Sequence, residues 1–209
     1  LADYWKIERV HPELDDNKGT SILIVNSQKG KELFEIIKKE LVYKESNIEK
    51  VTYAHTQPVA GKWMLQFPKG WGTPATLEVE ELAPWCNLPM SDEGKAFSGT
   101  VTYTTSFDWK NETKQVLLDL GKVNMIAEVF VNDQKIRTLW CSPYTVDISN
   151  FVKPGENKLQ VKVVSTWFNR LAFDASLPET ERKTWTIEGP KAGAQLKEYG
   201  LLGPVNLKY

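Results

Sequence analysis

The feature that most constrains the fold of this chain is an alternation of apolar and polar residues with a period of two. Lys158–Val163 alternates strictly, with Leu159, Val161 and Val163 on one face and polar residues on the other. Thr100–Phe107 repeats the pattern, and small hydroxyl residues alternate there with Val101, Tyr103, Thr105 and Phe107. Successive side chains point to opposite faces only in a strand, so both segments are predicted to be β-strands with one buried face.

Two more strands are predicted from shorter and more continuous apolar runs, at 116–120 and 126–131. Turn residues separate these segments, at Gly121, Asn132-Asp133 and Pro154-Gly155. Many short strands joined by such turns, without a helix pattern between them, indicate an antiparallel β-sandwich. A jelly roll is the arrangement that fits best.

The first fifty residues follow a different pattern. Ser21–Val25 is a short apolar run suited to a strand, and residues 30–40 place Leu33, Phe34, Ile36 and Ile37 at helical spacing. We therefore expect a small strand–helix element in residues 1–50 and the sandwich in residues 51–209. The small element is either the end of a preceding domain or a part packed against the sandwich. The sequence starts at Leu1 without an initiator Met or a signal-peptide pattern, so we expect a piece of a longer chain.

Charge and composition exclude several classes of partner. The 26 basic and 27 acidic residues give a net charge of −1, which provides no field for holding a nucleic acid. No apolar run is long enough to span a membrane. The eight tryptophans are unusual, and an indole ring can either fill a core or stack on the apolar face of a sugar ring.

The inventory of chemical groups predicts no catalytic centre, no metal site and no cofactor. The two histidines, His11 and His55, are far apart and lie near no nucleophile motif. Cys86 and Cys141 form no metal or redox motif, and they are either free thiols or one disulfide. A stand-alone hydrolase would have to use a carboxylate pair, for which Asp174 and Glu179 are the candidates.

Three stretches resemble one kind of domain. The first, Phe97–Tyr103, resembles the opening strand of the sugar-binding-type domain of glycoside hydrolase family 2. The second consists of residues 127–132 and 139–148, and it resembles the central strand of that domain, the hairpin and the Pro-aromatic step into the next strand. The third stretch combines 166–171, 177–179 and 184–186 with the closing 200–205, and it is similar to the C-terminal region of the family 106 α-L-rhamnosidases.

The resemblance implies a galactose-binding-like jelly-roll β-sandwich that serves as a non-catalytic accessory domain of a larger glycoside hydrolase, with a rhamnosidase-like activity. Such a domain would pack on the catalytic domain of the parent chain and could contact carbohydrate, in a periplasmic or secreted enzyme. The alternative is an autonomous carbohydrate-binding module that holds a polysaccharide by itself.

The candidate carbohydrate contacts lie mainly in the long connection 166–186, which carries more aromatic and hydrogen-bonding groups than a connector needs. They are Trp140, Tyr144, Trp167, Asn169, Arg170, Asp174 and Trp185. Two of these have alternatives: Trp140 could instead pack under the next loop, and Arg170 could pin the connection through a carboxylate.

Overall fold

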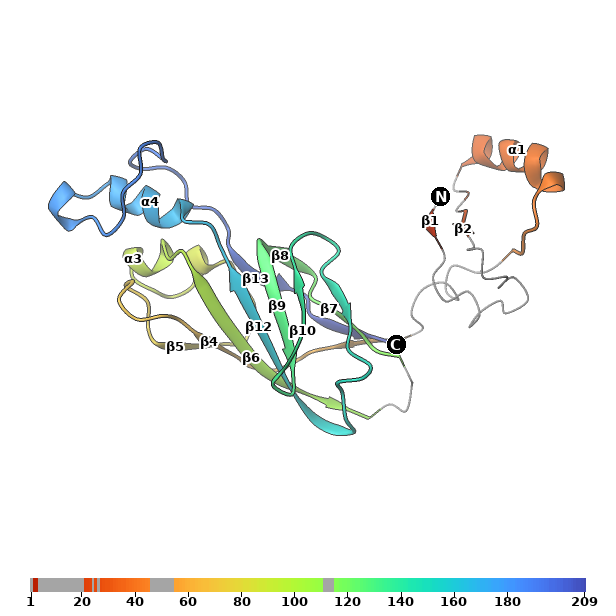
Figure 1. Ribbon diagram of the computed structural model, residues 1–209, viewed down its shortest axis with the longest axis horizontal. Coiled ribbons are helices and arrows are strands. Elements are labelled where there is room, and N and C mark those ends of the chain that lie inside the picture. Colours follow the sequence, from red (N-terminus) through yellow and green to blue (C-terminus); the bar gives the residue numbers. More distant parts are fainter. Residues whose placement is uncertain (1, 4–20, 24, 26, 46–54, 111–114) are drawn as a thin grey trace. The chain divides into compact units, whose positions relative to one another are not determined.

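The computed structural model describes residues 2–3, 21–23, 25, 27–45, 55–110 and 115–209 (Figure 1). The chain divides into two compact units, Leu1–Ala54 and His55–Tyr209. This boundary falls a few residues after the one placed at residue 50 from the sequence.

The first unit contains a strand pair and a helix, of which the sequence predicts the helix and one strand, at Ser21–Val25. Strands β1 (Ala2–Asp3) and β2 (Ser21–Ile22) pair antiparallel, and α1 (Gln28–Ile37) runs into a 3-10 turn, η3 (Lys38–Glu40). Helix α1 begins where Ser27 accepts a hydrogen bond from the Gly30 amide, an N-cap that satisfies one of the unpaired amides of the first turn. Its apolar residues remain largely exposed within this unit; Ile36 is 73% exposed.

The second unit contains two main antiparallel sheets and a small one. The larger sheet has the order β10–β9–β12–β6–β4–β5, and its strands are β4 (Trp63–Gln66), β5 (Thr76–Val79), β6 (Thr100–Trp109), β9 (Ile126–Val131), β10 (Gln134–Leu139) and β12 (Gly155–Val164). The facing sheet has the order β11–β7–β14–β3, formed by β3 (Thr56–Pro58), β7 (Leu117–Asp119), β11 (Thr145–Asp147) and β14 (Asn206–Lys208). Strands β8 (Lys122–Asn124) and β13 (Gly200–Gly203) pair with each other.

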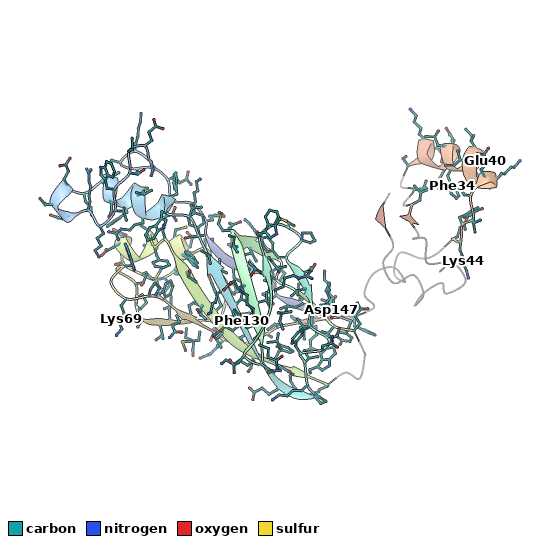
Figure 2. The ribbon with its side chains drawn as sticks, viewed as in Figure 1. Phe34, Glu40, Lys44, Lys69, Phe130 and Asp147 are labelled. Carbon is teal, nitrogen blue, oxygen red and sulfur yellow. The ribbon has the colours of Figure 1, made fainter. Side chains whose placement is uncertain are left out.

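The core confirms the predicted register of the two long central strands. In β12, Leu159, Val161 and Val163 are all 0% exposed, and β6 likewise buries Val101 and Tyr103. These side chains pack in one cluster with residues of the four-stranded sheet such as Leu118 and Leu207. The opposite face of the large sheet is polar, with the Lys162 ammonium 4.9 Å from the centroid of the Phe130 ring, which is labelled in Figure 2.

The Tyr103 hydroxyl lies inside this core and accepts two hydrogen bonds. The Trp85 indole donates to the Tyr103 hydroxyl at 2.6 Å, and the Leu201 amide donates to the same oxygen at 3.3 Å. Burial raises the pKa of Tyr103 to about 12. Gly200 (φ +133°) lets the backbone pass here, because a Cβ would lie 3.0 Å from both the Trp85 nitrogen and the Tyr103 oxygen.

Short helices lie at one end of the sandwich. The 3-10 turn η4 (Trp85–Asn87) and helix α3 (Asp92–Lys95) precede β6, and helix α4 (Phe168–Ala175) and the turn η5 (Glu179–Glu181) follow β12. Figure 1 shows α3 and α4 close together, at the end of the sandwich away from the C-terminus. The prediction that 166–186 is a connection without a helix pattern is therefore wrong, since eight of its residues form α4.

A candidate binding surface around helix α4

Helix α4 turns a polar side toward the protein interior. Asn169, Arg170 and Asp174 are 0%, 0% and 1% exposed, whereas Phe168 and Phe173 are only half-buried. Burying an isolated charge is costly, so a helix can take this orientation only if its polar groups find partners inside the protein.

The Arg170 guanidinium finds two carboxylates. Its Nη2 lies 2.5 Å from Asp174 Oδ1, one helical turn on, and its Nη1 lies 2.8 Å from Glu93 Oε1 on α3. The rings of Trp71 and Phe173 also contact it, with their centroids 5.4 and 5.3 Å from the guanidinium carbon. Arg170 therefore joins α4 to α3 and to the segment that carries Trp71.

The second oxygen of Asp174 holds the chain that follows η5. Asp174 Oδ2 accepts hydrogen bonds from the Thr184 amide at 2.7 Å, from the Thr184 hydroxyl at 2.6 Å and from the Lys183 amide at 3.1 Å. Burial alone would raise the pKa of Asp174, but the hydrogen bonds from Arg170 and Thr184 outweigh it, and the pKa lies below its ordinary value.

A carboxylate in this state is a poor general acid, because a catalytic acid needs a raised pKa so that it holds its proton near neutral pH. Glu179, the other member of the candidate pair, is exposed in η5. The arrangement gives no support to a stand-alone hydrolase that uses Asp174 and Glu179.

Two further contacts fix the rest of this segment. Asn169 makes a pair of hydrogen bonds with the backbone of Lys197, donating to its carbonyl and accepting from its amide, both at 2.8 Å. The Ser176 hydroxyl accepts from the Gly193 amide at 3.2 Å. The segment 183–197, which we call the anchored loop, is thus held at 183–184, at 193 and at 197.

The anchored loop carries two large apolar side chains that face solvent. Trp185 is 80% exposed and Ile187 is 87% exposed. Trp167, at the start of α4, is 48% exposed and lies beside Trp71, with their ring centroids 5.4 Å apart. An anchored loop that presents a tryptophan and an isoleucine to water has the composition of a contact surface.

Trp140 and Tyr144 follow strand β10. Trp140 is 77% exposed, so it does not pack under the next loop, and the half-buried Tyr144 donates its hydroxyl to the Met125 carbonyl at 2.7 Å. Strands β10 and β12 both run antiparallel to β9 and end beside its first residues, at Leu139 and Val164. Trp140 and Trp167 therefore leave the same end of the sheet, from strands about 10 Å apart.

The structure thus separates the seven candidate residues by exposure. The three tryptophans, Trp140, Trp167 and Trp185, are open to a ligand or partner. The other four, Tyr144, Asn169, Arg170 and Asp174, have protein partners. Sequence reasoning missed Glu93, Lys183, Trp71 and Ile187. The ion pairs of Glu93 with Arg170 and Lys183 join positions 77 and 90 residues apart, so no local pattern reveals them. Ile187 could have been noticed as an isolated apolar residue in a polar segment.

Neither a metal centre nor a membrane span is found in the described part of the chain. Its His, Cys, Asp and Glu side chains form no group of three that could hold a metal ion. Its helices include none with the length and apolar character needed to cross a bilayer. Cys86 and Cys141 are both free thiols.

The sandwich with its short helices at one end defines a class of domain, the galactose-binding-like domains. Residues 94–196 match the family described as "Glycosyl hydrolase 2 galactose-binding domain-like", and the sandwich domain belongs to that family. The resemblance identified from the sequence is confirmed. In glycoside hydrolases of family 2, a galactose-binding-like domain of this type is not the catalytic domain.

Two relatives share a third or more of their aligned residues with this chain. A protein of Formosa agariphila named "Putative beta-glucuronidase" is 36% identical, over 72% of this chain and 16% of its own length. The structure of a rhamnosidase from Novosphingobium sp. PP1Y is 33% identical with a TM-score of 0.65, and the match covers 80% of this chain and 16% of that one. The chain therefore spans about one sixth of the length of either relative.

A β-glucuronidase from Ruminococcus gnavus is more distant. It is 22% identical with a TM-score of 0.51, over 73% of this chain and 28% of that chain. At this identity the likeness shows the shared fold alone.

Proposed function

We propose that this chain is a non-catalytic accessory domain of a larger glycoside hydrolase, and that it packs on the catalytic domain of its parent through the anchored loop. The observation that carries the proposal is the exposure of Trp185 and Ile187 on a loop that buried side chains hold in place. Burial of both side chains in an interface would stabilise that interface by about 1.5–3 kcal/mol for each side chain.

The rhamnosidase of Novosphingobium sp. PP1Y supports the finer part of the proposal, that the parent is an α-L-rhamnosidase-like enzyme. Among the solved structures it is more similar to this chain, at 33% identity and a TM-score of 0.65, than is the β-glucuronidase of Ruminococcus gnavus, at 22% and 0.51. From the family resemblance we also propose that the parent is periplasmic or secreted. We expect the parent enzyme to hydrolyse an aryl α-L-rhamnoside but not an aryl β-D-glucuronide.

The packing surface is tested by replacing Trp185 and Ile187 together with Ser. In this 209-residue chain the double variant should melt at the same temperature as the wild type, because both side chains already face solvent. In the parent enzyme it should lower the melting temperature and the glycosidase activity. The matched control is Trp140→Ser, which removes another exposed tryptophan from outside the anchored loop. An unchanged parent with the double variant would refute the proposed interface.

A further inference from the structure

The connection between strands β4 and β5, residues 67–75, is fixed on helix α3. The Ser91 hydroxyl, at the N-cap of α3, donates to the Gly72 carbonyl at 3.0 Å. Gly72 (φ +73°) packs so closely on α3 that a Cβ atom there would lie 2.6 Å from Cγ of Glu93. Lys69, labelled in Figure 2, belongs to this connection. The β4–β5 connection, which carries Trp71, is therefore held in one position.

The side chain of Lys183 ties the anchored loop to the β4–β5 connection. Its Nζ atom donates to the Gly70 carbonyl at 2.8 Å and lies 2.7 Å from Oε1 of Glu93. The Lys183 side chain is 44% exposed, and Glu93 keeps Arg170 as a second partner. Loss of the Lys183 ammonium would therefore leave no buried charge unpaired, and an exposed ion pair adds little to the stability of the fold. What this ammonium does is hold the start of the loop in one place.

Trp71 joins the two parts of the helical end that expose tryptophan. Its ring lies 5.4 Å from the ring of Trp167 at the start of α4, and its neighbour Gly70 accepts the hydrogen bond from Lys183. Two residues of chain span at most about 7 Å, so the backbone of Trp185 remains close to the backbone of Lys183. Contacts of the β4–β5 connection thus hold both exposed tryptophans, Trp167 and Trp185, at the same end of the domain.

From these contacts we infer that Trp167 and the anchored loop form one docking surface for the catalytic domain of the parent, and that Lys183 is the residue that positions the loop in it. The inference rests on the proposed function. This chain spans about one sixth of the length of either relative, so most of an enzyme of that length lies outside it and can supply the covering partner.

The chemistry of the surface specifies the kind of partner face. Trp167, Trp185 and Ile187 would lose contact with water, so the facing patch of the catalytic domain must be apolar, because a charged group opposite them would be buried without a partner. Aromatic residues are enriched at the centre of such interfaces. A surface that is already held in place loses less conformational entropy when the two domains associate.

The test is hydroxyl-radical footprinting of the 209-residue chain and of the parent enzyme, in which mass spectrometry measures how fast each tryptophan side chain is oxidised. Trp167 and Trp185 should both be oxidised severalfold more slowly in the parent than in this chain. Trp140, which is 77% exposed and lies outside the surface, is the internal reference and should react at similar rates in both proteins.

Lys183→Met tests the positioning role. In this chain the variant should melt within about 3 °C of the wild type, because it removes only an exposed ion pair. In the parent it should restore fast oxidation of Trp185. Lys183→Arg, which keeps a cationic donor, should retain the protection of Trp185. The matched control is Lys191→Met, which removes an exposed lysine of the same loop and should leave the protection unchanged.

Three outcomes would overturn the inference and leave the proposed function intact. Protection of Trp185 without protection of Trp167 would show that the two do not share one surface. Protection of Trp185 that persists in Lys183→Met would show that Lys183 does not position the loop. A Lys183→Met chain that unfolded far below the wild type would make Lys183 a residue of the fold instead. Fast oxidation of Trp185 in the wild-type parent, by contrast, would refute the proposed function and the inference with it.

Discussion

At the scale of single residues, the environment of Arg170 explains most of what holds the helical end of the domain. A guanidinium with no exposed surface is compensated by Asp174 and Glu93, and Lys183 joins the network with its ammonium 2.7 Å from Glu93. Removal of Arg170 would leave the buried Asp174 carboxylate without the positive charge that compensates it.

Arg170→Ala should therefore destabilise the chain by about 3–5 kcal/mol, which is a loss of roughly 10 °C in melting temperature for a domain of this size. Thermal unfolding followed by circular dichroism measures the effect. Arg137→Ala, at an exposed position of β10, is the matched control and should melt near the wild-type temperature. If Arg170→Ala melted like this control, Arg170 would not be a structural residue.

The same network makes the stability depend on pH in the acid range. Hydrogen bonds from Lys183 and then from Arg170 hold the pKa of Glu93 below its ordinary value of 4.5, and the pKa of Asp174 also lies below its ordinary 3.8. A lowered folded-state pKa stabilises the fold above the unfolded-state pKa, and this stabilisation is lost as the pH falls through the folded-state pKa.

The stability of the wild type, measured by urea denaturation, should thus fall as the pH drops below about 4.5. Glu93→Gln should be less stable than the wild type at pH 7 and should lose less stability between pH 7 and pH 3. An equal loss in both proteins would show that Glu93 makes no contribution to the acid sensitivity.

At the scale of elements, α4 shows what the sequence could and could not predict. The sequence does carry a signal for this helix, because Phe168, Leu171, Ala172 and Ala175 lie at the i, i+3, i+4 and i+7 positions of an amphipathic helix. That pattern would nevertheless have missed the polar side, because the structure buries Asn169, Arg170 and Asp174 and, of the apolar set, only Ala172. Glu93, the partner of Arg170 on α3, lies 77 residues away, so periodicity within the helix cannot indicate which side faces the protein.

The anchored loop should be released when its carboxylate anchor is neutralised. Asp174→Asn removes the negative charge and one of the two acceptor oxygens, and the oxygen that remains cannot serve both the Arg170 guanidinium and the amides of Lys183 and Thr184. Trypsin should then cleave after Arg182 and Lys183 at least several times faster, because proteolysis requires local opening of the backbone. Mass spectrometry of the fragments locates the cuts.

Cleavage after Lys158 and Lys162, in the central strand β12, is the internal control and should remain slow in the folded variant. A loop that was no more sensitive in Asp174→Asn than in the wild type would show that the Asp174 hydrogen bonds do not anchor it.

At the scale of the whole molecule, the sandwich could be predicted because its strands and turns follow from local patterns in the sequence. The alternation in β6 and β12 specifies which side chains face the core, and the positive φ angles of Asn132 and Asp133 occur in the predicted turn between β9 and β10. The order of strands in the two sheets is set by pairings between distant segments, such as β3 with β14, which no local pattern encodes. The candidate surface could be predicted only in part. The sequence shows its tryptophans, but it does not show the network of contacts that positions them.

The extent of the independently folding unit follows from the same long-range pairing. The hydrophobic core of the described residues contains nothing before Val59, and the backbones of His55 and Tyr209 exchange two hydrogen bonds at 2.9 and 3.1 Å. A fragment of residues 55–209 should therefore melt within about 2 °C of the full chain. A fragment of residues 61–209 should melt several degrees lower, because β14 loses its partner β3 and the core loses Val59. Equal melting temperatures for the two fragments would mean that β3 does not belong to the cooperative unit, whereas a large loss already in 55–209 would mean that the first unit stabilises the sandwich.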